Sequence, residues 1–188
     1  GDAGAVETLD GARVTWWDRE ANRDTSPRWV HDAVVKGLEA IDLEIVSRET
    51  PRALEALAAR PPLAGRVHFA GHREDPRDDY RAMDAFALVS DSEQMPVALL
   101  EAMASSLPVA ATEVGDVRRI LPEVQHDFCR PLSPGVVDEL AASLRTLAGD
   151  AALRERCGAA NRARVEERYD FPVMLDAHRA LWRRTAGR

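Results

Sequence analysis

Short apolar runs alternate with longer helical patterns along most of this 188-residue chain. Such alternation is typical of βαβ units, in which a helix crosses over between parallel strands. It predicts an α/β fold, with an open parallel sheet and helices on both faces. The expected strands are Ala12–Trp17, Leu43–Ser47, Arg66–Ala70, Ala85–Ser90, Pro108–Thr112 and His126–Arg130.

Six strands suit a Rossmann-like sheet, and the helix-start signals agree with it. A capping residue followed by proline marks three starts, because proline has no N–H to leave unpaired in the first turn. These pairs are Ser26-Pro27, Thr50-Pro51 and Ser133-Pro134. We expect a linker over residues 1–10 and one Rossmann-like domain over residues 11–170.

Two helices are predicted at the end of the chain, Asp150–Arg168 and Phe171–Arg184. The second carries apolar residues at i, i+3, i+4 and i+7 spacing, so one of its faces is apolar and has to pack on something. We expect residues 171–188 to form a helix that reaches another domain.

Composition and charge exclude several classes of function. The net charge is −7 and arginine is spread along the chain, which argues against a nucleic-acid partner. The two cysteines, Cys129 and Cys157, form no CxxC pair, so neither a disulfide framework nor a metal site is expected. A reducing cytoplasm fits best, and no signal peptide or membrane-spanning stretch is visible.

The most informative stretch runs from Ser90 to Thr112. An apolar strand ends, a short polar loop follows, and a helix is expected to open at Pro96. In open α/β sheets ligands bind in the crevice outside the carboxyl ends of the strands, so this loop should line that crevice. The first-turn N–H groups of the helix have no intrahelical partner and lie at the positive end of its dipole, which suits a diphosphate.

Glu101 is the one charged residue between Gln94 and Thr112, on a helix that is otherwise apolar or small all round. Such a helix is usually buried, and a buried carboxylate needs a partner. That partner could be an arginine or backbone amides, or it could be the vicinal diol of a ribose. Glu93, just before the helix, could accept hydrogen bonds from sugar hydroxyls, although a loop acid is more often simply solvated.

The segment Glu93-Gln-Met-Pro-Val-Ala-Leu-Leu-Glu101 resembles the E-x7-E motif of retaining glycosyltransferases of family 4 (group 1), which have the GT-B fold. Its flanks are similar to that family as well, in Val67–His72, Ala85–Asp91 and Leu107–Gly115. The resemblance implies a single GT-B half-domain, the C-terminal half that binds the donor.

Carried over residue by residue, the resemblance implies that Glu101 binds the donor ribose and that Glu93, the catalytic candidate, faces the transferred sugar. The backbone of the loop would hold sugar hydroxyls or phosphate, at Gln94, Met95, Pro96 and Val97. The base would meet Gly71 and His72. The family neutralises the diphosphate with an arginine and a lysine after the first strand, where this chain has Arg19 and Arg23. No cofactor and no metal are implied.

The implied function is transfer of a sugar, with retention, from a nucleotide-diphosphate sugar to a carbohydrate or lipid-linked acceptor. It would need an N-terminal acceptor-binding domain, which could also bring peripheral membrane association, so this chain alone is expected to be inactive. Two alternatives stay open at this point. One is a non-catalytic module that binds sugar nucleotides or serves as a scaffold, and the other is a nucleotide-sugar epimerase or hydrolase of the same fold.

Overall fold

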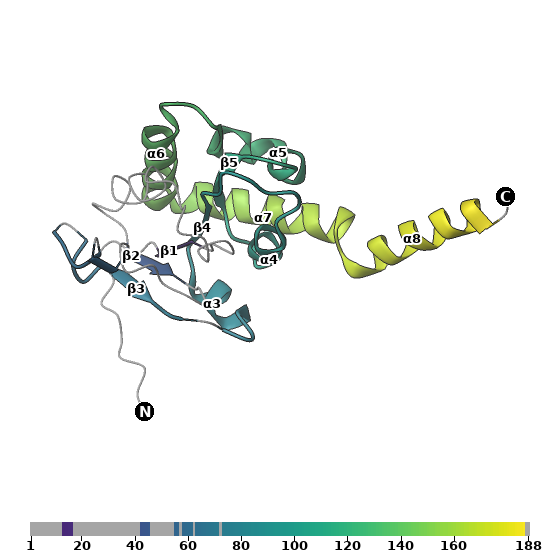
Figure 1. Ribbon diagram of the computed structural model, residues 1–188, viewed down its shortest axis with the longest axis horizontal. Coiled ribbons are helices and arrows are strands. Elements are labelled where there is room, and N and C mark those ends of the chain that lie inside the picture. The colour runs from purple at the N-terminus through teal and green to yellow at the C-terminus, as the bar shows by residue number, and fades with distance from the viewer. Residues whose placement is uncertain are drawn as a thin grey trace.

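Six parallel strands form one sheet, in the order β3-β2-β1-β4-β5-β6, in the computed structural model of the chain (Figure 1). The structure describes residues 13–16, 42–45, 55–56, 58–61, 63–71 and 73–186. The strands are β1 (Arg13–Trp16), β2 (Asp42–Ile45), β3 (Val67–Phe69), β4 (Ala85–Leu88), β5 (Val109–Glu113) and β6 (Cys129–Pro131). The strand order reverses between β1 and β4, as in a Rossmann sheet.

Strand β4 shows why helices cover both faces of the sheet. Successive side chains of a strand point to opposite faces. Ala85, Ala87 and Val89 enter one apolar cluster, while Phe86 and Leu88 enter the other, and all five are buried. Complete burial of a side chain such as Phe86 or Leu88 contributes about 1.5–3 kcal/mol to the free energy of unfolding, relative to leaving it exposed. The predicted open parallel α/β sheet with helices on both faces is therefore confirmed.

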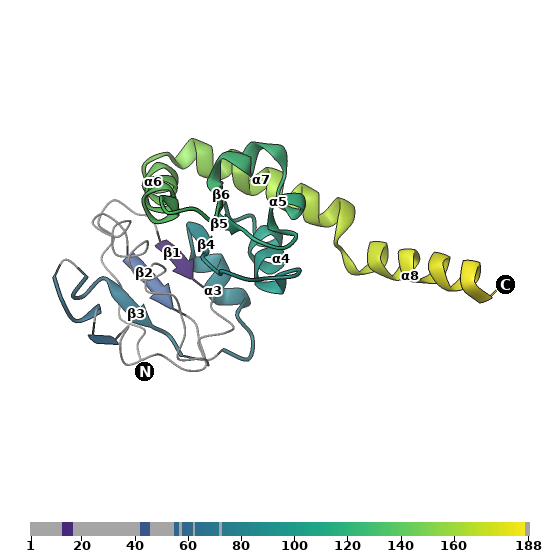
Figure 2. The same cartoon turned by 45° about the horizontal axis from the view of Figure 1, so that its top comes forward.

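Helices lie on both faces of the sheet (Figures 1 and 2), and α7 (Ala151–Arg168) contributes a buried residue to each cluster. The Phe86 side is covered by three helices, α3 (Arg77–Ala82), α4 (Val97–Ala104) and α5 (Val117–Ile120). The Ala87 side is covered by α6 (Val136–Gly149) and by part of α7. The sequence patterns did not predict α3 or α5.

Two expected helix starts differ from the structure. Helix α4 begins at Val97, because Pro96 keeps an extended backbone with ψ 115°. Helix α6 begins at Val136 and not at Ser133-Pro134, because Ser133 instead closes a turn in which its carbonyl oxygen accepts from the Val136 N–H at 3.1 Å. The expected starts at Ser26-Pro27 and Thr50-Pro51 and the linker over residues 1–10 lie outside the described residues.

The predicted strand His126–Arg130 was wrong over most of its length. A 3-10 helix, η2 (Glu123–Phe128), occupies it, and β6 begins only at Cys129. The helical turn places the buried Gln125 side chain against β5, where its Oε1 accepts from the Val109 N–H at 2.7 Å. That buried hydrogen bond favours the helical turn over an earlier start of the strand.

Helix α7 holds the far end of α4. The Arg162 guanidinium donates to the Ala104 carbonyl oxygen at 2.7 Å, and the buried Asn161 amide donates to that of Leu107 at 2.7 Å. Gly158 of α7 lies so close to Ser106 that an added Cβ would overlap the Ser106 carbonyl oxygen. The C-terminal end of α4 is thus fixed by three successive contacts.

Helix α8 (Phe171–Ala186) extends away from the body of the molecule, as both ribbon views show (Figures 1 and 2). None of its residues is buried, and Phe171 and Trp182 are 66% and 61% exposed. The predicted helix Phe171–Arg184 is therefore present, and it continues to Ala186. None of the described helices is long and apolar enough to cross a membrane.

The loop between β4 and α4 is held by the turn that follows β5. Gly115 has a positive φ of 51°, and a Cβ added there would lie 2.6 Å from the Gln94 carbonyl oxygen and closer still to that of Glu93. The Asp116 N–H donates to the Gln94 carbonyl oxygen at 2.9 Å, and the Thr112 hydroxyl donates to the carbonyl oxygen of Ser90. The loop backbone is thereby fixed from its beginning to Gln94.

We expect Gly115→Ala to lower the free energy of unfolding by about 2 kcal/mol or more. The left-handed conformation alone costs an L-residue about 1–2 kcal/mol, and the new methyl group must also displace the Glu93–Gln94 peptide. Denaturant unfolding measures the loss. Gly149→Ala is the matched control, because its added Cβ meets nothing within 4 Å and alanine favours the helix there. Equal stability of the two variants would contradict the close contact at Gly115.

Candidate functional site

A hollow of about 220 Å³ lies at the carboxyl end of β4. Its lining consists of the end of β4, the loop after it and the first turn of α4: Leu88, Glu93, Gln94, Met95, Pro96, Val97 and Ala98. Strand β4 is the neighbour of β1, and the strand order reverses between these two. The hollow therefore lies where a parallel α/β sheet binds its ligands.

The first turn of α4 places the positive end of the helix dipole at the hollow. The amide groups of Val97, Ala98 and Leu99 have no intrahelical acceptor, since the first intrahelical bond runs from the Leu100 N–H to the Pro96 carbonyl oxygen at 3.4 Å. Pro96 is buried and contributes no N–H. Free amides at the positive end of a helix dipole suit a phosphate or another anion.

The side chains of the loop after β4 differ in their exposure to solvent. Gln94, Met95 and Val97 are exposed, with Met95 at 52% and Val97 at 46%, so apolar surface lies open beside the hollow. Glu93 is half-buried, and its Oε1 accepts a hydrogen bond from the Ser90 hydroxyl at 2.8 Å. The structure thus brings the predicted residues Glu93 to Val97 together around one hollow.

Glu101 lies one turn further along α4 than Val97, and the expectation that it is buried was wrong. It is exposed, on the same open face of α4 as Val97. The inner face of α4 is buried through Ala98, Leu99, Ala102 and Met103, whereas Val97 on the other face is 46% exposed. An apolar composition all round a helix therefore did not imply burial all round.

The partner of Glu101 is a buried hydroxyl. Tyr80 of α3, 2% exposed, donates its hydroxyl hydrogen to Glu101 Oε2 at 3.0 Å. Burial, and then the charge of Glu101, raises the pKa of Tyr80 well above its usual value of 10, so the hydroxyl stays protonated. Neither of the expected structural partners, an arginine or backbone amides, is recorded for Glu101 among the described residues.

Of the other predicted site residues, Gly71 lies further along the same edge of the sheet. Gly71, which has a positive φ of 71°, follows β3, and β3 is three strands away from β4. Three spacings of about 4.8 Å separate the ends of these strands by about 14 Å. Gly71 is not among the residues that line the hollow. His72, Arg19 and Arg23 lie outside the described residues.

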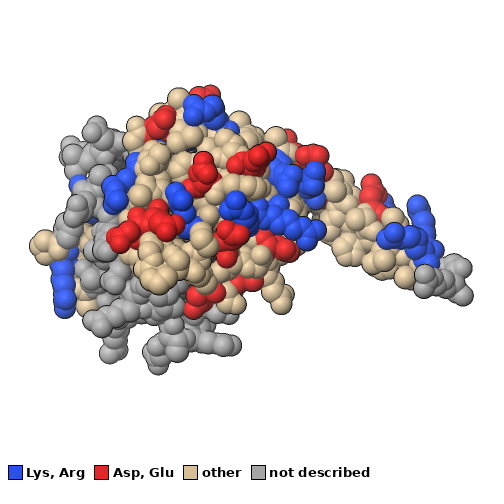
Figure 3. All heavy atoms as spheres, turned by 90° about the horizontal axis from the view of Figure 1, so that it is seen from above, with Lys and Arg blue, Asp and Glu red and all other residues tan. Residues whose placement is uncertain are grey.

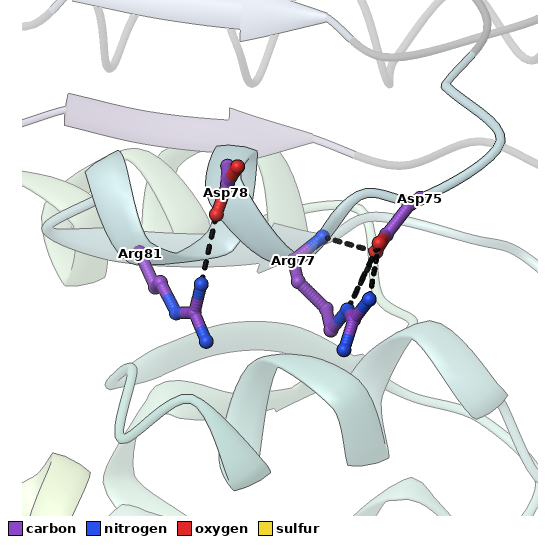
Figure 4. Close-up of polar contacts among 4 residues, drawn as sticks. All are labelled: Asp75, Arg77, Asp78 and Arg81. Atoms are coloured by element: carbon purple, nitrogen blue, oxygen red, sulfur yellow. Dashed lines mark hydrogen bonds and ion pairs between the residues drawn. The ribbon is translucent and has the colours of Figure 1, made fainter.

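The cations near α3 are paired with acids of their own segment (Figure 4). The Arg77 guanidinium donates to the Asp75 carboxylate, with Nε at 2.8 Å, and Arg81 pairs with Asp78 at 2.8 Å. The hydrogen bonds from Arg77 lower the pKa of Asp75 to about 2. Cations and acids are also interleaved on the face that Figure 3 draws, over the part of the chain that the structure describes. That part contains no group of three or more His, Cys, Asp or Glu side chains that could hold a metal ion.

The contacts that Tyr80, Ser90 and Gly115 make at the site were not predicted from the sequence. Tyr80 is the one aromatic residue in the charged run from Arg73 to Arg81, which could have marked the inner face of a short helix. The links from these residues to Glu101, Glu93 and Gln94 join separate elements, and no local pattern shows them.

The chain matches the family model described as glycosyl transferases group 1 over residues 20–150. It is 40% identical over 93 residues to the sulfoquinovosyl transferase SQD2 of Arabidopsis thaliana, a match that covers 49% of this chain and 18% of that protein. The matched segments span less than a fifth of the length of each curated relative that the chain matches.

Solved structures show the same fold. The sucrose-phosphate synthase of Thermosynechococcus elongatus superposes with a TM-score of 0.80 at 21% identity, over 96% of this chain and 47% of that one. Anabaena Alr3699/HepE in complex with UDP and glucose superposes with a TM-score of 0.76 at 20% identity, over 92% and 48%. The chain therefore corresponds to about half of a GT-B protein, and since the family model covers most of its length, it belongs to the group 1 glycosyltransferases.

Proposed function

We propose that this chain is the donor-binding half of a retaining glycosyltransferase that takes its sugar from a nucleotide-diphosphate sugar. The observation that carries the proposal is the hollow at the start of α4, where Glu93 and free helix amides lie together with Glu101 one turn away. HepE, which shares the fold, was crystallised with UDP and glucose. Membership of the group 1 family supports sugar transfer as the reaction.

In this proposal the donor lies along the carboxyl edge of the sheet. The base meets the backbone near Gly71 and His72, the ribose meets Glu101, and the sugar enters the hollow beside Glu93. The diphosphate lies at the amides of Val97 and Ala98, and Arg19 and Arg23, which follow β1 in the sequence, are the candidates that balance its charge. No metal is needed where helix amides and arginines supply the positive charge.

The chemistry follows from where charge develops. The bond between the anomeric carbon and the diphosphate oxygen breaks, and its electron pair leaves with the diphosphate. Amides that point at this oxygen stabilise the transition state more than the ground state, because the negative charge on the oxygen is then larger. Retention brings the acceptor hydroxyl to the face from which the diphosphate departs, so the departing oxygen is the nearest base for the acceptor proton. Glu93, oriented by Ser90, holds the sugar hydroxyls.

The first test is Glu101→Gln. A thermal-shift screen of the wild-type protein against UDP-, GDP- and ADP-sugars identifies the donor, since a ligand of the native state raises the apparent stability. Calorimetric titration with that donor should then show about 10- to 100-fold weaker binding by the variant, because hydrogen bonds to a charged group contribute about 1.5–3 kcal/mol. Glu101→Ala should abolish binding while the fold stays intact.

Glu166→Gln is the matched control, because it removes the same charge from an exposed position of α7, outside the lining of the hollow. Its affinity for the donor should equal that of the wild type. Unchanged affinity of Glu101→Gln, or no thermal shift with any of the donors, would overturn the donor site.

We further propose that α8 packs on an N-terminal domain that binds a carbohydrate or lipid-linked acceptor. The helix extends from the body with Phe171, Met174, Leu181 and Trp182 exposed, all on one side of its helical repeat. The matched solved chains are about twice as long as this one, which leaves room for a second domain. Peripheral membrane association, where it occurs, would then come from that domain.

Hydrogen exchange tests this packing. In a protein that contains both halves, the amides of α8 should exchange at least about 10-fold more slowly than in the 188-residue chain, because burial against a partner suppresses local opening. Helix α7 is the internal control, since its inner face is buried in the chain itself and its protection should not change. Equally fast exchange of α8 in both proteins would refute the packing.

A further inference from the structure

Tyr80 lies between the core and the candidate site. Its ring is buried and packs at a tilt of 56° on Phe86, with 6.1 Å between the ring centroids. Its hydroxyl oxygen lies 3.0 Å from Glu101 Oε2 and 3.5 Å from the Ala98 carbonyl oxygen. The ring is thus fixed by the core, while the hydroxyl reaches the open face of α4.

The short helix that carries Tyr80 is anchored at its start. The Tyr80 N–H donates to the Pro76 carbonyl oxygen at 3.0 Å, and the Arg77 N–H donates to the Asp75 carboxylate at 3.2 Å. Figure 4 shows the Arg77 side chain folded back onto the same carboxylate, at the start of α3. Arg77 and Arg81 are exposed, so Tyr80 is the buried side chain of α3, and the position of its hydroxyl follows from that of the helix.

A hydroxyl in this position restricts a carboxylate that would otherwise rotate. A glutamate on an exposed helix face samples several rotamers, and a ligand that needs one of them must fix it on binding. The hydrogen bond from Tyr80 holds Oε2 on the inner side and leaves acceptor sites on both oxygens for a ligand. One hydroxyl cannot neutralise the charge, so Glu101 remains a strong acceptor for two further donors.

We propose that Tyr80 is a positioning residue that holds the Glu101 carboxylate in the orientation in which it accepts hydrogen bonds from the two vicinal hydroxyls of the nucleotide ribose. This proposal rests on the donor site proposed above and adds to it the residue that selects for a ribonucleotide. Tyr80 itself touches no substrate.

The test compares affinities for UDP, GDP and ADP with those for their 2′-deoxy counterparts, in the full-length protein. For the nucleotide that binds, Tyr80→Phe should weaken binding of the ribonucleotide by about 3- to 10-fold, the range expected when one side chain has to be ordered on binding. Binding of the 2′-deoxynucleotide should weaken less, so the ribo-to-deoxy preference should fall. A purely structural role of Tyr80 would weaken both nucleotides equally.

Two variants separate this role from a general effect on the fold. Tyr169→Phe is the matched control, because Tyr169 is half-buried and packs against the same apolar cluster, and its ribo-to-deoxy preference should stay at the wild-type value. Glu101→Asp changes an exposed position and keeps the charge, but it withdraws the carboxylate from Tyr80. Its ribo-to-deoxy preference should fall as in Tyr80→Phe.

The results distinguish a failure of the role proposed for Tyr80 from a failure of the proposed donor site. If the wild type binds a nucleotide and Tyr80→Phe keeps its ribo-to-deoxy preference, the positioning role of Tyr80 is overturned while the donor site stands. If the wild type binds none of the nucleotides, the donor site is overturned and the role of Tyr80 with it. Should Tyr80→Phe fail to fold, Tyr80→Leu, which also lacks the hydroxyl, takes its place in the same comparison.

Discussion

The candidate site depends on a contact between two backbones. The turn at Gly115 lies against the Glu93–Gln94 peptide at a distance that leaves no room for a side chain, and the Asp116 amide closes the contact with a hydrogen bond. The loop after β4 is therefore supported by the loop after β5, the next strand in the sheet. Since α4 starts directly after this loop, the direction of its free amides is set there. At the opposite end, the contacts from Gly158, Asn161 and Arg162 hold the last turn of α4.

In each of the two glutamates of the site, one carboxylate oxygen accepts a hydrogen bond from a side-chain hydroxyl. Ser90 holds Glu93 within the same loop, and Tyr80 holds Glu101 from a different helix. A neutral donor fixes the orientation of a carboxylate without cancelling its charge, whereas an arginine would do both. Both acids therefore keep their capacity to accept hydrogen bonds from a ligand rich in hydroxyl groups.

Local pattern was sufficient for much of the fold. The alternating apolar runs predicted the sheet, because a strand that is buried on both faces, such as β4, has to be apolar throughout. Local pattern failed where a distant contact decided the outcome. Gln125 makes its hydrogen bond to a strand sixteen residues away and takes a helical turn to do so, where a short strand was expected.

For the site, the sequence located the loop and both glutamates but misjudged the environment of Glu101. A helix that is apolar apart from one glutamate can leave one face exposed beside a binding site. The hydrophobicity of its residues does not distinguish such a helix from one that is buried on all sides. Tyr80 could not be linked to Glu101, because the two residues are twenty-one positions apart and meet only once α3 and α4 have packed on the sheet. The roles of all the predicted site residues stay predictions, and Arg19, Arg23 and His72 lie outside the described residues.

The backbone of the loop is fixed while the side chains of Gln94 and Met95 point outward. Substitution of Gln94 or Met95 should therefore not change what the backbone amides bind, because replacing an outward side chain leaves the peptide where the Gly115 turn holds it. The same two side chains border the hollow and contribute to its shape. Natural variation can therefore alter which molecule fits the hollow without moving the free amides of α4. The ligand can then change during evolution while the scaffold stays the same.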